Sequence, residues 1–219
     1  SNPDTSIILS TQALKIANKA KYQTGIGQSC HNLGTFHHLK GSYDTALTYY
    51  NNALEIWKQL EKYKPEIRNN LSATLGNIGL IYWNQGDYLT ALDHYRQALE
   101  IFKELGDKNK IATVLGYIGN IYYEQGDYPT ALDHYRQALE IKKELGNKSH
   151  IAIWLANIGL LFSALAEQEK DIRKRDSLHA AAMEHYKQSI QIADEIGYKY
   201  MMASSRYSLA NLYIKQGNP

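Results

Sequence analysis

The chain has 219 residues, of which 44% are hydrophobic and 21% charged, and its formal net charge is +2. The apolar content excludes intrinsic disorder, and the single cysteine, Cys30, excludes an internal disulfide and a zinc site built from cysteines. The near balance of acidic and basic residues, with a pI near 8.4, argues against nucleic-acid binding, which typically needs a strongly basic surface.

The sequence shows no signal peptide and no membrane-spanning segment. Its most apolar stretch free of charged residues, 151–166, is 16 residues long, whereas a membrane-spanning helix needs about 20. We therefore expect no direct membrane insertion of this stretch of protein. Ser1-Asn2 and Gly217-Asn218-Pro219 look like cuts through a larger protein, which leaves the compartment, cytoplasmic or periplasmic, open.

An internal repeat dominates the chain. Residues 85–105 and 125–145 agree at 19 of 21 positions at an offset of 40. The two copies differ only at two positions, which hold Leu89/Pro129 and Phe102/Lys142. A repeat of this length indicates an array of identical structural units rather than a single globular core.

Each copy predicts two helices joined by a tight turn. In the first helix apolar residues fall at helical spacing, as at Leu75, Ile78 and Tyr82. A glycine suits the left-handed end of that helix, and the aspartate after it, Asp87, is a good N-cap for the second helix. Gly79 and its equivalents recur inside the first helix, where we expect the second helix to pack too closely for a side chain.

The pattern L-x-x-I-G-x-x-Y followed by A-x-x-x-Y-x-x-A resembles the tetratricopeptide repeat (TPR). It is written here as Leu75, Ile78, Gly79, Tyr82, Ala91, Tyr95 and Ala98. The period of 40 instead of 34 is similar to the longer repeats of spindle-orientation adaptors, kinesin light chains and bacterial TPR regulators. The resemblance implies an all-α fold, a right-handed superhelical α-solenoid of antiparallel helix pairs with about ten helices, in which neighbouring repeats supply the core.

The repeat frame predicts a single TPR solenoid over residues 1–219. It comprises a helix of a preceding repeat at 4–22, repeats at 26–65, 71–107, 111–147 and 151–197, and a lone first helix at 201–216. The linker 61–70 is five residues longer than its counterparts and contains Pro65. The fourth repeat carries an insertion of about eleven residues near 166–177, which is rich in charge and is interpreted as a loop or a helix extension.

Histidines are the obvious candidates for chemistry. His94, His134 and His185 share one repeat position, beside recurrent tyrosines that we expect in the core. Neighbouring helices pack about 8–10 Å apart and zinc–nitrogen bonds are about 2 Å, so repeat-equivalent histidines are poorly placed to share an ion. No hydrolase or metalloprotease motif is present. We therefore predict a protein that is not an enzyme, with no cofactor and no metal.

The resemblance implies that the first helices of the repeats line a concave groove that binds a partner. The predicted partner-binding residues are amide, aromatic or apolar: Asn77, Leu80, Trp83, Asn120, Tyr123, Ile153, Asn157, Leu160 and Asn211. Gly76 and Gly116 are expected to leave room below Trp83 and Tyr123, although both rings could instead pack against the next repeat. The basic residues with which some TPR proteins grip acidic chaperone tails are missing from this face, so that role is disfavoured.

The fourth repeat gives a more specific hypothesis. Its first helix is apolar on nearly every side, with Ile153 and Leu160 expected on the open side. Either a partner covers this side or the insertion folds back over it.

The sequence thus predicts a non-catalytic TPR interaction module, or scaffold, that binds a protein or peptide in its groove, with no nucleic acid. The alternative is a ligand-sensing regulatory segment of a larger bacterial signalling protein, such as a histidine kinase, a nucleotide cyclase or a transcription regulator. End-to-end self-association is a further possibility, through apolar faces at Ile7/Ile8/Leu9 and Leu209/Leu212/Tyr213.

Overall fold

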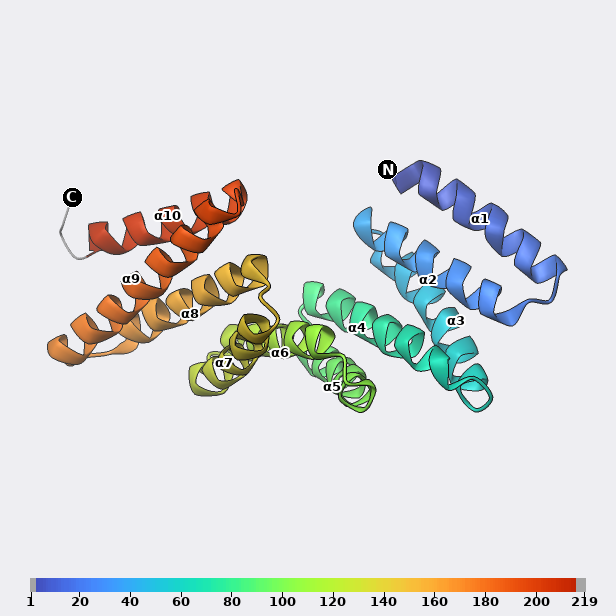
Figure 1. Ribbon diagram of the computed structural model, residues 1–219, viewed down its shortest axis with the longest axis horizontal. Helices are drawn as coiled ribbons and strands as arrows, with labels where there is room; N and C mark the ends of the chain where they lie inside the picture. The colour runs from blue at the N-terminus through green and yellow to red at the C-terminus, as the bar shows by residue number, and fades with distance from the viewer. Residues whose placement is uncertain (1–2, 216–219) are drawn as a thin grey trace. The chain divides into compact units, whose positions relative to one another are not determined.

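The computed structural model describes residues 3–215, which form ten α-helices, one short 3₁₀ helix and no strand (Figure 1). The helices are α1 Pro3–Lys19, α2 Gln23–Leu39, α3 Tyr43–Glu61, η1 Pro65–Ile67, α4 Arg68–Asn84, α5 Tyr88–Leu105, α6 Lys108–Glu124, α7 Tyr128–Glu144, α8 Lys148–Gln168, α9 Ile172–Glu195 and α10 Lys199–Lys215. The all-α prediction with about ten helices is confirmed. Residue 216, the last of the predicted final helix, lies outside the described residues.

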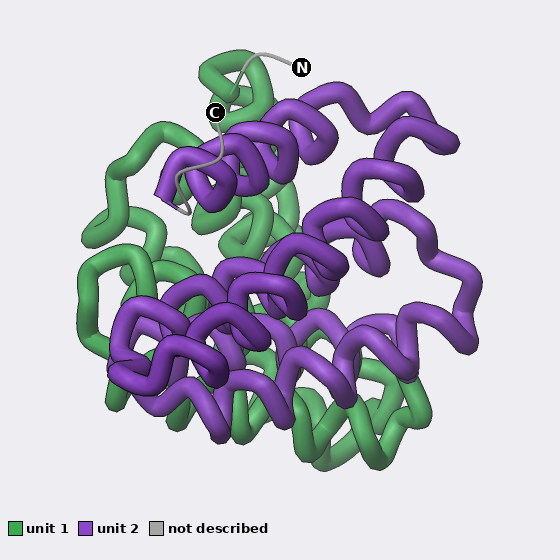
Figure 2. The backbone as a smooth tube through the Cα atoms, turned by 90° about the vertical axis from the view of Figure 1, so that its left-hand side faces the viewer, with its two compact units in different colours: residues 1–107 green, residues 108–219 purple. Residues whose placement is uncertain are grey.

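The chain divides into two compact units, residues 1–107 and 108–219 (Figure 2). In the first unit α2 pairs with α3 and α4 with α5, while α1 packs on α2. In the second unit α6 pairs with α7 and α8 with α9, while α10 packs mainly on α9. Each unit is therefore a stack of helix pairs, as the repeat predicts.

The turns inside the pairs follow from local sequence. The side chain of Asp87 accepts a hydrogen bond from the Thr90 backbone N–H at 3.1 Å, and Asp127 does the same for Thr130 at 3.2 Å. Gly86, just before the first of these caps, has a φ of 79°, which residues with a side chain rarely adopt. The predicted glycine-aspartate turn is thus confirmed.

The glycine inside each first helix lies under a tyrosine of the second helix. A Cβ added to Gly79 would lie 3.0 Å from the ring of Tyr95, and one added to Gly119 would lie 2.8 Å from the ring of Tyr135. A Cβ at either position would force the tyrosine ring to shift, so the recurrent glycine makes room for the recurrent tyrosine ring. The expected close packing is confirmed, and the four tyrosines at this position are buried in the core.

Ion pairs join the first residue of a first helix to the last turn of its second helix. Lys108 meets Glu144 at 2.8 Å, 36 residues on, and Lys148 meets Glu195 at 3.0 Å, 47 residues on. The extra eleven residues of the fourth repeat therefore leave the base of its helix pair unchanged. Exposed pairs of this kind contribute little stability, and they serve here as markers of register.

The insertion lengthens both helices of the fourth repeat. α8 continues to Gln168, and α9 begins at Ile172 after only three residues. The helix-extension interpretation is confirmed, and Leu160 of α8 remains 44% exposed, so the insertion does not cover it. Among residues 3–215, α8 alone is long and apolar enough to cross a membrane, by length and composition only. Of its most apolar window, 44% is buried inside the fold.

The apolar face at the C-terminal end differs from the prediction. Leu212 is only 3% exposed and joins a core cluster with Ala182 and Tyr186, against which Leu209 also packs. The large exposed side chains of α10 are instead Tyr200, Tyr207 and Ile214. The expected exposure is wrong because Leu209 and Leu212 lie on the side of α10 that packs against Ala182 and Tyr186 of α9. At the other end Ile8 and Leu9 are exposed, as expected.

Candidate functional site

The nine predicted site residues all lie on first helices of the repeats, on α4, α6, α8 and α10. Asn77, Leu80 and Trp83 belong to the first unit, and each is half-buried. The other six belong to the second unit, where the structure brings three of them together.

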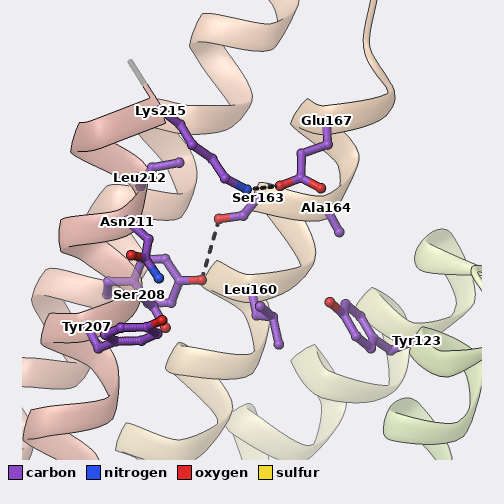
Figure 3. Close-up of a pocket in the computed structure, with 11 residues that line it drawn as sticks. Tyr123, Leu160, Ser163, Ala164, Glu167, Tyr207, Ser208, Asn211, Leu212 and Lys215 are labelled. Atoms are coloured by element: carbon purple, nitrogen blue, oxygen red, sulfur yellow. Dashed lines mark hydrogen bonds and ion pairs between the residues drawn. The ribbon is translucent and has the colours of Figure 1, made fainter. Parts of the chain in front are cut away.

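Tyr123 of α6, Leu160 of α8 and Asn211 of α10 line one pocket of about 350 Å³, which we call the α6/α8/α10 pocket (Figure 3). Leu160 is 44% exposed, and Figure 3 shows its side chain between the rings of Tyr123 and Tyr207. An apolar side chain between two rings offers a contact surface for an apolar group of a partner.

Hydroxyl groups form the inner wall of the pocket. The buried Tyr186 hydroxyl lies 3.4 Å from Ser163 Oγ and is also hydrogen-bonded by Ser208. Burial raises the pKa of Tyr186, and the pKa of Tyr123 is raised to about 12, first by burial and then by nearby tyrosines and the carboxylates of Glu124 and Glu167. Both phenols therefore stay neutral at physiological pH.

Hydrogen bonds within the fold already use some of the polar groups of the asparagines that were predicted to line a groove. Asn120 Oδ1 accepts hydrogen bonds from Tyr135 Oη at 2.8 Å and from Asn157 Nδ2 at 3.3 Å. Asn77 also hydrogen-bonds the hydroxyl of Tyr50, which itself donates to Thr35 Oγ1 at 3.0 Å. Neither Asn120 nor Asn157 lines the pocket, whereas Asn211 does, and its amide has no side-chain hydrogen bond among residues 3–215. Asn211 thus has both a donor and an acceptor open to a partner.

The space expected at Gly116 is filled. The indole of Trp154, from α8, packs so closely that a Cβ on Gly116 would lie 2.0 Å from it, and the same indole stacks on Tyr135 with ring centroids 6.0 Å apart. The prediction that Gly116 leaves room below Tyr123 was therefore wrong, because the next repeat supplies a large side chain there. A Cβ on Gly76 would meet no atom of its unit within 4 Å.

Ile153 is half-buried and packs against a core cluster of Ala152, Ala193 and Met201, so part of its side chain belongs to the core. Leu160, two turns later on α8, does lie open.

The repeat-equivalent histidines pack against aromatic rings. His134 stacks on Tyr122 at 5.5 Å and His94 on Tyr82 at 5.5 Å. The Nδ1 atoms of His94 and His185 lie 2.9 and 2.8 Å from backbone carbonyl oxygens one turn earlier. Within the described part of the chain, no group of three or more His, Cys, Asp or Glu is placed to hold a metal ion.

Sequence reasoning missed Glu167 and Lys215, which form an ion pair at one edge of the pocket (Figure 3). Glu167 lies in the part of α8 that the insertion adds, beyond the end of the equivalent helix α6. The charged insertion was recognised, but its helical phase could not be derived without knowing that it extends α8.

Family models for the tetratricopeptide repeat match the chain over residues 70–144, 111–170 and 27–62. A comparison with curated protein sequences finds no match.

Solved structures with similar folds include BtubC (BKLC) from P. vanneervenii, with a TM-score of 0.64 and 16% identity over 100% of this chain and 94% of that one. A Rap protein complexed with Competence and Sporulation Factor has a TM-score of 0.66 and 19% identity over 97% of this chain and 59% of that one. Aspartyl phosphate phosphatase F from Bacillus subtilis has a TM-score of 0.72 and 17% identity over 93% of this chain. The chain spans 50% of the length of that phosphatase, and at these identities the likeness concerns the fold alone.

Proposed function

Because the chain belongs to the tetratricopeptide repeat family, we propose that it is a non-catalytic protein-interaction module that binds a peptide or protein partner along the first helices of its repeats. The α6/α8/α10 pocket is the centre of this proposal, and Asn77, Leu80 and Trp83 are the corresponding contacts in the first unit. The observation that carries the proposal is the convergence of Tyr123, Leu160 and Asn211, from three consecutive first helices, on one open pocket.

The chemistry of the pocket supports a partner in extended conformation. The exposed Leu160 between two tyrosine rings suits one apolar side chain, and such aromatic-lined anchors dominate binding energy at interfaces. The amide of Asn211 can donate to a backbone carbonyl and accept from a backbone N–H, as an extended segment requires. A solved structure of similar fold holds Competence and Sporulation Factor, which supports the idea that such helix stacks accommodate a partner.

The test compares affinity capture by the wild-type protein with capture by Leu160→Asp and by Tyr207→Ala, read by quantitative mass spectrometry. The matched control is Leu89→Asp, because Leu89 is 78% exposed but lies on α5, a second helix. We expect the same partners to be lost from both pocket variants and retained by the control, with unchanged circular dichroism. Equal capture by all four proteins would exclude the pocket as the binding site.

A ligand-sensing segment of a longer bacterial protein is the second candidate. It is favoured by the fold likeness to a Rap protein and to aspartyl phosphate phosphatase F, of which this chain spans 59% and 50%. A sensor must pass a change from one unit to the other, so partner binding in the second unit should alter amide hydrogen exchange in α1 to α5. Exchange changes confined to residues 108–219 would favour simple capture.

A further inference from the structure

A second, charged pocket adjoins the first, and the inserted residues build it. This pocket has a volume of about 610 Å³, and its ionisable lining consists of Glu167, Glu169, Arg175, Asp176, His179 and Lys215. Four of these six residues lie between 167 and 176, within the inserted stretch at the top of α8 and α9. A repeat without the insertion would lack this pocket.

The Glu167–Lys215 ion pair separates the two pockets, since both side chains line both of them. Each charge of the pair is balanced by the other. The remaining carboxylates, Glu169 and Asp176, outnumber the one remaining fixed cation, Arg175. Glu169 accepts one bond from the Asp171 backbone N–H at 2.9 Å, which leaves its second oxygen for a ligand.

We propose that the fourth repeat recognises an extended segment that places an apolar side chain in the α6/α8/α10 pocket and a basic side chain, Lys or Arg, in the charged pocket beyond the Glu167–Lys215 pair. This inference rests on the proposed function and specifies its partner. The apolar preference comes from Leu160 and the two rings, and the basic preference comes from the excess of carboxylates in the second pocket.

The geometry of α8 also fixes the spacing. Glu167 follows Leu160 by seven residues, which is about 10.5 Å along an α-helix. An extended segment advances about 3.3 Å per residue, so the ion pair lies about three residues from the apolar anchor. A side chain just beyond the pair therefore belongs to the residue about four positions from the anchor.

The experiment selects phage-displayed random twelve-residue peptides on the whole purified chain at low salt. The test variant is Glu169→Gln/Asp176→Asn, in which both carboxylates become amides of the same shape. The matched control is Asp133→Asn/Glu140→Gln, two exposed carboxylates of α7 that line neither pocket. A third variant, Leu160→Asp, reports on the proposed function itself.

We expect wild type and the Asp133/Glu140 control to enrich peptides with an apolar residue and a Lys or Arg about four positions away. The Glu169/Asp176 variant should retain the apolar residue and lose the basic one. A synthetic peptide with Lys at that position should bind wild type about two- to five-fold more tightly than the same peptide with Ser. The two peptides should bind the Glu169/Asp176 variant with equal affinity.

Two results would overturn the inference in different ways. The charged subsite is rejected if basic residues are enriched equally on the Glu169/Asp176 variant, or if they are not enriched on wild type. Either result is compatible with the apolar pocket as a binding site. If wild type enriches no peptide relative to the Leu160→Asp variant, both the proposed function and this inference are rejected.

Discussion

The indole of Trp154 occupies the space that the missing side chain of Gly116 leaves, so that an added Cβ would lie 2.0 Å from it. Gly76 holds the same repeat position, and a Cβ there would meet no atom of its unit within 4 Å. Two glycines at the same repeat position thus have different surroundings, because a ring fills the space at Gly116 and the space at Gly76 is open.

Alanine at these two positions should therefore change stability in opposite directions. Gly116→Ala must displace a buried indole and should lower the free energy of unfolding by about 1–3 kcal/mol. Gly76→Ala should raise it by about 0.5–1 kcal/mol, because alanine is the better helix former and nothing obstructs it. Urea unfolding of both variants checks this, and a stabilised Gly116→Ala protein would show that Trp154 does not pack as described.

Lys142 is fully buried, although the equivalent residue of the preceding, nearly identical repeat is Phe102. Its Nζ donates to the backbone oxygen of Asn109 at 2.9 Å and to Thr113 Oγ1 at 3.0 Å. At the same offset of 40, Thr113 corresponds to Ala73, which has no hydroxyl to offer. The lysine and the threonine therefore form a matched pair, and the preceding repeat holds Phe102 and Ala73 at the same two positions.

Lys142→Ala should lower the free energy of unfolding by about 2–4 kcal/mol, because it leaves a void and unpaired oxygens. The double variant Lys142→Phe/Thr113→Ala, which copies the preceding repeat, should recover most of that loss, while Lys142→Phe alone should not. Urea unfolding of wild type, Lys142→Phe, Thr113→Ala and the double variant gives the coupling energy. Independent effects of the two substitutions would contradict the pairing.

The sequence determined most of the architecture because a 40-residue repeat constrains every copy at once. The helix pairs, the Gly-Asp turns and the glycine under each tyrosine all follow from residues that recur, such as Gly79 and Gly119. Three of the predicted groove residues meet in one pocket for the same reason.

What the repeat could not predict comes from residues that occur once. Trp154 fills the place expected to be empty at Gly116, and nothing in the copy of the repeat at Gly76 signals it. Ile153 and Leu160 lie on one stripe of α8, but only contacts with Ala193 and Met201 decide that the former is packed. Glu167 and Lys215 meet because the insertion extends α8, which its charge pattern alone leaves undetermined.

Histidines of α2 make the first unit sensitive to acid. Burial lowers the pKa of His31 below its ordinary value of 6.5, and His31 Nδ1 lies 2.8 Å from Thr74 Oγ1. The pKa values of His37 and His38 are lowered as well, in both cases chiefly by burial. Because the unfolded chain takes up these protons first, the stability they contribute is complete above pH 6.5 and is lost as the pH falls through their folded-state pKa values.

We therefore expect the urea midpoint of unfolding to fall between pH 7.5 and pH 5.5, and to fall less in a His31→Gln variant. The carboxyl groups with lowered pKa, Asp87 and Glu195, titrate below 4.5 and do not contribute in this window. A midpoint that is constant over this range, or an undiminished decrease in His31→Gln, would contradict the assignment.

Ile153 and Leu160 provide a direct separation of folding from binding. Aspartate at Ile153 introduces a charge beside the buried Ala152, Ala193 and Met201 and should lower the free energy of unfolding by several kcal/mol. Aspartate at Leu160 places its charge in an open pocket and should change stability by less than about 1 kcal/mol while abolishing binding of an apolar anchor. Thermal unfolding and isothermal titration with a selected peptide measure the two effects on each variant.

The conservative variant Leu160→Met should restore binding, because it supplies apolar surface of similar volume. If Leu160→Asp unfolds the protein as Ile153→Asp does, then Leu160 belongs to the core, and the pocket does not serve as a partner site.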